Sequence, residues 1–252
     1  MDDETWEAYS HYISKSRLSS MDFCPLKFKK NYIDGIRDDS PNFTLTTGTR
    51  FHNFAEAFFP VAYEYDPECW YDFIHEDFSP YERTMITWFI DREYERLQLL
   101  NNDIDLWMPI AREEKYLNHT LQLRGIIDRI DCIGDTYVIV EYKTGKSIYK
   151  PAMQKEFGFY VLLLKEDPYF KDAKFTGCVI NPRIQEIQFM TPSREDTILR
   201  HLEKLRNAIA NNDFPPSCTP AKFASCQMCS SLEEANLYQE YKSDPSYVEG
   251  TW

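Results

Sequence analysis

Two carboxylates and a lysine stand out because of their spacing around one short turn. A Gly-Asp pair at 134–135 separates two runs whose side chains alternate as in strands, which is typical of a two-residue hairpin loop. In that register Asp128 lies directly opposite Glu141, with Cβ atoms about 4.5–5.5 Å apart. Lys143 shares the face of Glu141, because side chains alternate along a strand. The sequence therefore predicts two acids and a lysine on one face of a hairpin.

Two carboxylates placed so close together need an explanation. Like charges about 5 Å apart repel by about 3 kcal/mol at an effective dielectric constant of about 20. One carboxylate can take up a proton, or both can turn into solvent or toward an arginine. Apolar neighbours such as Ile126, Ile130 and Ile139 favour a partly buried face. A divalent cation also relieves the repulsion, and oxygen ligands favour Mg²⁺ or Mn²⁺. From the register alone, the metal-bound and metal-free interpretations both stay open.

The same residues resemble a known motif. Gly-Ile-Ile-Asp128, followed by Glu141-Tyr-Lys143-Thr-Gly, is similar to the PD-(D/E)xK nuclease motif, with isoleucine where the motif's name has proline. More specifically, it resembles the RecB-like branch, which includes the CRISPR-associated RecB-like exonucleases. The resemblance implies that Asp128 and Glu141 are metal ligands and that Lys143 is the catalytic lysine. It also implies that the backbone carbonyl of Tyr142 ligates metal.

Two helical segments extend the resemblance. Gly-Thr-Arg-Phe-His52 resembles an upstream motif whose histidine binds metal, although a histidine on a phenylalanine-rich helix, taken alone, is more often a core residue. Glu56, one turn beyond on the same face, is either a supporting residue or a solvated charge. A later segment resembles the family's Gln-and-Tyr helix and implies supporting roles for Gln154 and Tyr160. The family spaces that pair by four residues. Here Glu156 stands four before Tyr160, which is alternatively a core residue.

Four cysteines form a second candidate site. The segment from Ser16-Arg-Leu-Ser to Phe-Cys24-Pro resembles the opening of the family's iron–sulfur members. That resemblance implies a four-iron four-sulfur cluster held by Cys24, Cys218, Cys226 and Cys229. Cys218 precedes the Cys-x-x-Cys pair, whereas the family's third C-terminal cysteine follows it. From the residues alone, zinc, an iron–sulfur cluster and free thiols all stay open. The other cysteines are expected to be ordinary buried residues: Cys69, Cys132 and Cys178.

Hydrophobic periodicity and turn signals predict the elements that position these residues. The first predicted helix spans 18–32, with Ser14 or Ser16 as its cap, and the second begins at Thr47 or Thr49. Further helices are predicted over 81–100 and 152–165, and a last one ends at about 211. The predicted strands span 108–117, 121–133, 137–143, 175–180 and 184–190. We expect a mixed α/β fold. The resemblance makes its sheet restriction-endonuclease-like, flanked by helices and preceded by an N-terminal helical portion.

We expect one RecB-like nuclease domain over residues 1–232. It has a helical part at about 1–105, a catalytic α/β core at about 106–212 and a Cys-rich segment at 213–232. An acidic tail at 233–252 is expected to be partly disordered.

Charge and composition restrict the partners. The net charge of −13 argues against a broadly basic surface for duplex DNA, but a carboxylate site recruits cations that supply positive charge locally. No apolar run approaches the about 20 residues that span a bilayer, and the acidic N-terminus lacks a signal-peptide apolar segment. The odd count of seven cysteines does not suit a secreted disulfide framework. We therefore expect a cytoplasmic protein with no membrane partner.

The resemblance implies metal-dependent hydrolysis of phosphodiester bonds in DNA. Within that branch, an exonuclease acting on single-stranded ends suits the acidic chain better than an enzyme that wraps duplex DNA. The main alternative is a non-catalytic DNA-binding or assembly subunit that keeps the nuclease fold. A further alternative is a zinc- or cluster-bearing interaction protein whose hairpin carboxylates pair by coincidence.

Overall fold

The computed structural model describes residues 2–36, 43–219, 226 and 229, which divide into two compact units. The first unit comprises Met1–Tyr12 and Pro41–Ile198, and the second comprises Ile13–Ser40 and Leu199–Trp252. The single domain over 1–232 stays a prediction, and the acidic tail at 233–252 lies outside the described residues. Within the described part of the chain, no helix is both long enough and apolar enough to cross a membrane.

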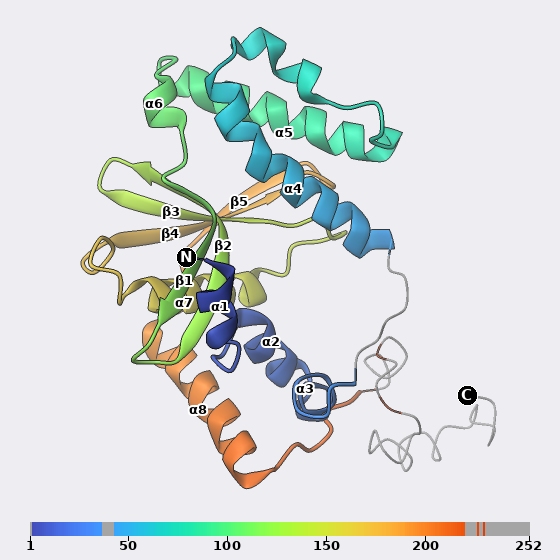
Figure 1. Ribbon diagram of the computed structural model, residues 1–252, viewed down its shortest axis with the longest axis vertical. Coiled ribbons are helices and arrows are strands. Elements are labelled where there is room, and N and C mark those ends of the chain that lie inside the picture. The colour runs from blue at the N-terminus through green and yellow to red at the C-terminus, as the bar shows by residue number, and fades with distance from the viewer. Residues whose placement is uncertain (1, 37–42, 220–225, 227–228, 230–252) are drawn as a thin grey trace, which may run out of the picture. The chain divides into compact units, whose positions relative to one another are not determined.

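A five-stranded mixed sheet forms the centre of the first unit (Figure 1). Its strands are β1 (Ala111–Asn118), β2 (Leu123–Ile133), β3 (Thr136–Tyr142), β4 (Lys174–Asn181) and β5 (Glu186–Met190). They lie in sequence order, and only β3 and β4 pair in parallel, so the helix between them, α7 (Lys150–Leu164), makes the crossover. The prediction of a mixed α/β fold is confirmed.

The hairpin of β2 and β3 has the predicted register. Ile133 pairs with Thr136 across the turn, and the ladder continues to Arg129 and Val140. Gly134 adopts a φ of +63°, which the turn requires and which costs glycine nothing. One step beyond the end of this ladder lies Asp128, at the position from which the predicted register faces Glu141.

Helices with aromatic faces cover one side of the sheet. They are α4 (Phe43–Tyr63), the 3₁₀ helix η1 (Pro67–Phe73), α5 (Pro80–Leu99) and the short α6 (Ile104–Trp107), while α1 (Asp3–Ala8) opens the unit. Their rings pack edge to face, as between Phe58 and Trp70, and join Val138, Val140 and Tyr142 in one core. α5 begins with a capping box between Ser79 and Glu82, close to its predicted start.

The start of α4 was predicted wrongly. The helix begins at Phe43 instead of at Thr47 or Thr49. Threonine is only mildly unfavourable inside a helix, and Thr47 is buried, so packing outweighs the intrinsic preference for a cap.

α7 covers the opposite side of the sheet, and two glycines allow it to approach closely. A Cβ on Gly177 of β4 would stand 2.2 Å from a ring carbon of Phe157, and one on Gly125 of β2 would stand 2.7 Å from Leu163. Both strands therefore carry glycine where large α7 side chains lie against the backbone. This packing sets the height of α7, and hence of Tyr160 and Glu156, above β2 and β3.

The second unit contains a helix break that the sequence analysis did not predict. The expected helix at 18–32 is divided into α2 (Lys15–Phe23) and α3 (Pro25–Tyr32), with Cys24 extended at φ −164° and ψ 117°. Proline disfavours a helical residue before it and lacks an N–H, so Pro25 ends one helix and starts the next. Ser14 caps α2 as predicted. The unit also holds most of α8 (Glu195–Asn211).

Candidate metal centre

Three ligand-type side chains from three elements converge at one end of the sheet. His52 of α4, Glu113 of β1 and Asp128 of β2 offer atoms that all lie within 4.8 Å of one another. His52 Nδ1 is 3.4 Å from Glu113 Oε1 and 3.6 Å from Asp128 Oδ1. One imidazole and two carboxylates form a donor set that suits a divalent cation.

Glu113 is the member that sequence reasoning missed. β1 and β2 pair on both sides of it, at Arg112 with Arg129 and at Glu114 with Ile127. Glu113 itself has a φ of +43°, an uncommon conformation for a residue with a side chain. The interruption falls opposite Asp128, so the backbone is distorted where the two carboxylates meet. The β1–β2 connection is longer than a two-residue turn, so the sequence alone did not give the register of these two strands. Without that register, Glu113 could not be placed opposite Asp128.

Glu141 is buried and held from two sides. Only 2% of it is exposed. Its Oε2 accepts a hydrogen bond of 2.9 Å from the Tyr160 hydroxyl, and its Oε1 accepts one of 2.6 Å from Lys143 Nζ. Lys143 Nζ also lies 3.2 Å from Glu156 Oε1. The lysine is therefore held between two carboxylates above the hairpin.

Asp128 is oriented by the backbone of the neighbouring strand. Its Oδ2 accepts a hydrogen bond of 2.8 Å from the N–H of Tyr142, while its Oδ1 faces His52. The Tyr142 ring is buried and stands edge-on to Phe51 and to His52. The strand thus fixes one carboxylate oxygen of Asp128, and the other oxygen points toward His52.

The electrostatics of the cluster favour positive charge. Burial disfavours the charged form of His52, but its hydrogen bond to the Glu113 carboxylate and the charges of Asp128 and Glu141 outweigh this effect and raise the His52 pKa. Burial, followed by the negative charge of Glu141, raises the pKa of Tyr160 well above its usual value. Tyr160 therefore stays protonated and serves as a donor to Glu141.

A cavity of about 590 Å³ opens beside these residues. His52, Glu56, Glu113, Glu141 and Lys143 all contribute to its walls. Glu56 is exposed there, so it contributes charge to the opening of the cavity.

The structure does not bring Gln154 to the cluster. Its side-chain amide donates instead to the carbonyl oxygen of Thr191, at 3.3 Å. Tyr160 and Glu156, four residues apart on α7, occupy the positions next to Glu141 and Lys143. The α7 residues that contact Lys143 and Glu141 are therefore Glu156 and Tyr160, which are four residues apart.

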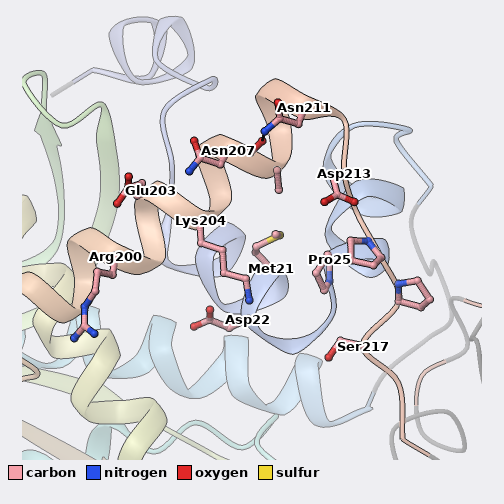
Figure 2. Close-up of a pocket in the computed structure, with 13 residues that line it drawn as sticks. Met21, Asp22, Pro25, Arg200, Glu203, Lys204, Asn207, Asn211, Asp213 and Ser217 are labelled. Carbon is pink, nitrogen blue, oxygen red and sulfur yellow. Dashed lines mark hydrogen bonds between the residues drawn. The ribbon is translucent and has the colours of Figure 1, made fainter.

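Cavity size alone does not identify the site. A cavity of about 670 Å³ lies in the second unit (Figure 2), where Asp22 and Met21 of α2 face Arg200, Glu203 and Lys204 of α8. Asp22 also binds His201 Nδ1 at 2.7 Å. The charges here are mixed and spread along a helix. The smaller cavity at the hairpin is the one with converging donor atoms, which is what metal binding needs.

The four candidate cluster cysteines gather in the second unit. Burial raises the pKa of Cys218, and the neighbouring thiols of Cys24 and Cys226 raise it further, while a hydrogen bond with Cys229 acts in the opposite direction. Cys24 Sγ also accepts the N–H of Ser217, at 3.3 Å. The break at Pro25 places Cys24 between two helices, next to the segment that follows α8. Cys24, Cys226 and Cys229 therefore all lie close enough to Cys218 to affect its thiol.

The remaining cysteines differ from one another. Cys178 is buried and Cys69 is half-buried, but Cys132 is exposed, so its predicted burial was wrong. Cys132 lies at the end of β2, where the hairpin extends toward solvent.

Comparison with known families agrees with this geometry. A sequence model of the PD-(D/E)XK nuclease superfamily matches residues 12–233. The chain belongs to the PD-(D/E)XK nuclease superfamily. Membership implies a metal-dependent nuclease with DNA as its substrate, and the mixed sheet flanked by helices is consistent with that fold. No curated protein matches the chain.

Proposed function

We propose that this PD-(D/E)XK protein is a metal-dependent exonuclease that prefers single-stranded DNA ends. One observation carries the proposal: His52, Glu113 and Asp128 converge within 4.8 Å, beside the buried Glu141 and the half-buried Lys143. In the proposed site, Mg²⁺ or Mn²⁺ is held by the three carboxylates of Glu113, Asp128 and Glu141 and by the His52 imidazole, with the Tyr142 carbonyl as a further ligand.

Each side chain has a role that its contacts support. The metal, when bound, polarises the scissile phosphate and activates the attacking water. Lys143 orients that water or stabilises the developing charge. Glu156 and Glu141 hold the Lys143 ammonium in place at 3.2 and 2.6 Å. Tyr160 fixes the Glu141 carboxylate, so the ligand keeps its orientation as charge develops.

The preference for single-stranded ends rests on charge and on the size of the cavity. The chain carries a net charge of −13, which as a whole repels a phosphate backbone. A cavity of about 590 Å³ accommodates a strand end better than a duplex flank. Hydrolysis from an end therefore fits this site better than cleavage within a duplex.

We also propose that Cys24, Cys218, Cys226 and Cys229 bind a four-iron four-sulfur cluster, with zinc as the alternative. The thiol contacts around Cys218 support this assignment. The cluster connects Cys24, near the N-terminus, to the segment after α8, and takes no part in hydrolysis. A reducing cytoplasm, expected from the cysteine usage, keeps such thiols available.

The proposal is tested by cleavage of end-labelled single- and double-stranded DNA with Mn²⁺ or Mg²⁺. Wild-type protein is compared with Glu141→Ala and with Glu114→Ala, whose side chain is exposed on β1. We expect metal-dependent cleavage in the wild type and in Glu114→Ala, and its loss in Glu141→Ala. The product ladder reports the polarity of cleavage.

Two outcomes would refute the proposal. Folded, metal-loaded wild type that binds DNA without cutting it would identify a non-catalytic subunit. Cleavage that survives in Glu141→Ala would place the active site elsewhere.

The cysteine assignment has a separate test. Cys24→Ser should abolish the brown colour and the iron content of anaerobically purified protein, while Cys132→Ser should retain both. Stoichiometric zinc without iron in the wild type would replace the cluster with a zinc site.

A further inference from the structure

The segment that follows Lys143 is held by backbone and side-chain hydrogen bonds from the end of β4. The Lys143 N–H donates to the carbonyl of Ile180, at 3.0 Å. The next two carbonyls, of Thr144 and Gly145, then accept bonds from side chains near the β4–β5 turn. Successive hydrogen bonds thus fix the chain just where it leaves β3.

Asn181 provides the central bond. It is the last residue of β4 and has 0% exposure. Its Nδ2 donates to the Gly145 carbonyl at 3.0 Å, and its Oδ1 accepts the N–H groups of Arg183 at 3.1 Å and Ile184 at 3.4 Å. One amide therefore builds the β4–β5 turn and attaches the segment after Lys143 to it.

Arg183 adds a second bond from the same turn. Its Nη1 donates to the Thr144 carbonyl at 3.3 Å, and its guanidinium carbon lies 5.6 Å from the centroid of the Tyr81 ring. The Tyr81 contact restricts the guanidinium plane. Arg183 is half-buried, so its replacement disturbs the fold less than replacement of Asn181.

The other side of the segment contacts α4. A Cβ on Gly48 would stand 3.1 Å from Thr144 Oγ1, so the two approach closely. Gly48, Thr144 and Gly145 all line the cavity that contains His52 and Lys143. The position of the segment therefore determines one wall of the candidate active site.

We propose that Asn181 and Arg183 are positioning residues that fix the segment from Lys143 to Gly145 against the cavity. This inference rests on the proposed nuclease function. Neither side chain is assigned a contact with substrate or metal. They act by holding two backbone carbonyls, and thereby the path of the chain that carries Lys143. A displacement of about 1 Å at such a site is enough to cost about a hundredfold in rate.

A second buried asparagine offers a matched control. Asn118 is the last residue of β1 and has 4% exposure. Its Nδ2 donates to the Leu162 carbonyl at 2.8 Å, and its Oδ1 accepts the N–H of Leu121 at 2.7 Å. It therefore makes the same kinds of bond at a strand end, but holds α7 and the β1–β2 connection instead of the cavity wall.

The experiment compares Asn181→Ala, Asn181→Asp, Arg183→Met, Arg183→Lys and the control Asn118→Ala by two measurements. The first is kcat and KM for metal-dependent DNA cleavage, normalised to folded protein. The second is amide hydrogen exchange of a peptide spanning residues 143–148 in the metal-free protein. Asn181→Asp keeps the acceptor for the turn but lacks the donor to Gly145, so it separates the two roles of the side chain.

We expect Asn181→Ala and Asn181→Asp to lower kcat by about ten- to a hundredfold, with a smaller change in KM. Arg183→Met should lower kcat by a smaller factor, and Arg183→Lys should recover part of the loss. Asn181→Ala, Asn181→Asp and Arg183→Met should all speed exchange in residues 143–148. Asn118→Ala should lose a similar amount of thermal stability while kcat and exchange in that peptide stay close to wild type.

Unchanged kcat and unchanged exchange in Asn181→Asp and Arg183→Met would overturn the inference. Equal losses of kcat in Asn118→Ala would also overturn it, since the effect would then follow stability alone. A wild type that binds metal but does not cleave would instead refute the proposed function. The exchange measurement would still decide whether Asn181 and Arg183 fix the segment.

Discussion

Two clusters of charged side chains include neighbouring residues of β2, and they differ in how their charges are balanced. The buried ion network consists of Glu93, Arg96, Arg129 and Asp131. The metal-site cluster consists of His52, Glu113, Asp128 and Glu141. Because side chains alternate along a strand, Arg129 faces the helices α4 and α5, while Asp128 belongs to the other cluster.

The buried ion network is balanced and fully paired. Arg129, at 1% exposure, binds Asp131 through two bonds of 2.8 and 2.6 Å and binds Glu93 at 2.6 Å. Arg96 Nε lies 2.8 Å from the second oxygen of Glu93. Burial opposes ionisation of Glu93, but Arg129 and Arg96 outweigh it and lower its pKa. Two arginines face two carboxylates, so the network needs no further ligand.

The metal-site cluster has an excess of negative charge and an opening to solvent. Glu113, Asp128 and Glu141 surround an imidazole whose pKa they raise, and Glu141 also accepts a hydrogen bond from Lys143. The backbone is distorted at Glu113, and a cavity lies alongside. The balance of charges therefore distinguishes a structural cluster from a binding cluster. A paired network stabilises the fold, whereas carboxylates in excess beside a cavity attract a cation.

The largest expected effect comes from breaking the balanced network. Arg129→Met leaves Glu93 and Asp131 buried without their main partner, so the free energy of unfolding should fall by about 3–5 kcal/mol. Chemical denaturation followed by tryptophan fluorescence measures this. Arg92→Met, which removes an exposed pair with Glu95, should cost about 1 kcal/mol or less. A loss of similar size in both variants would contradict the distinction.

The next effect concerns activity and separates two adjacent glutamates. Glu113→Gln removes a proposed ligand, so metal-dependent cleavage should fall by about a hundredfold or more, since even the outer partners of metal ligands are worth about ten- to a hundredfold. Glu114→Gln, exposed on the same strand, should retain activity. Cleavage rates at saturating Mn²⁺ decide between them. Full activity in Glu113→Gln would remove this residue from the site.

A smaller effect is expected on thermal stability. Mn²⁺ at about tenfold its Kd should stabilise the wild type by about 1.4 kcal/mol, which corresponds to a rise in Tm of roughly 3–6 °C for a chain of this size. Asp128→Asn should lose this shift, and Glu114→Gln should keep it. Calorimetry with and without the ion measures Tm. An equal shift in Asp128→Asn would mean that the ion binds elsewhere.

The smallest effect is on thiol reactivity beside the buried ion network. Burial, opposed only in part by Arg129, raises the pKa of Cys178 to about 12. Because the thiolate is the reactive form, only about one thiol in a thousand is ionised at pH 9, and alkylation should be negligible until the protein unfolds. The exposed Cys132 should react readily. Peptide mass spectrometry after alkylation distinguishes them, and rapid labelling of native Cys178 would show that water reaches the network.

Local rules predicted the parts of the fold that depend on neighbours in sequence. The Gly-Asp turn determined the β2–β3 register, and helical periodicity predicted a helix over 81–100, within one residue of α5 at each end. Packing outweighed these rules at the start of α4, which they placed too late. The helix break at Cys24 was also missed, although Pro25 is a local signal for it.

The sequence by itself determined that Asp128, Glu141 and Lys143 belong to one hairpin, because a two-residue turn and strand alternation act over short distances. Only the tertiary structure decided that His52 and Glu113, 61 residues apart, lie side by side. Their meeting depends on the rotation of α4 against the sheet and on the distortion in β1. It likewise decided that Asn181 holds Gly145, since a buried amide finds its partner through packing and not through sequence spacing.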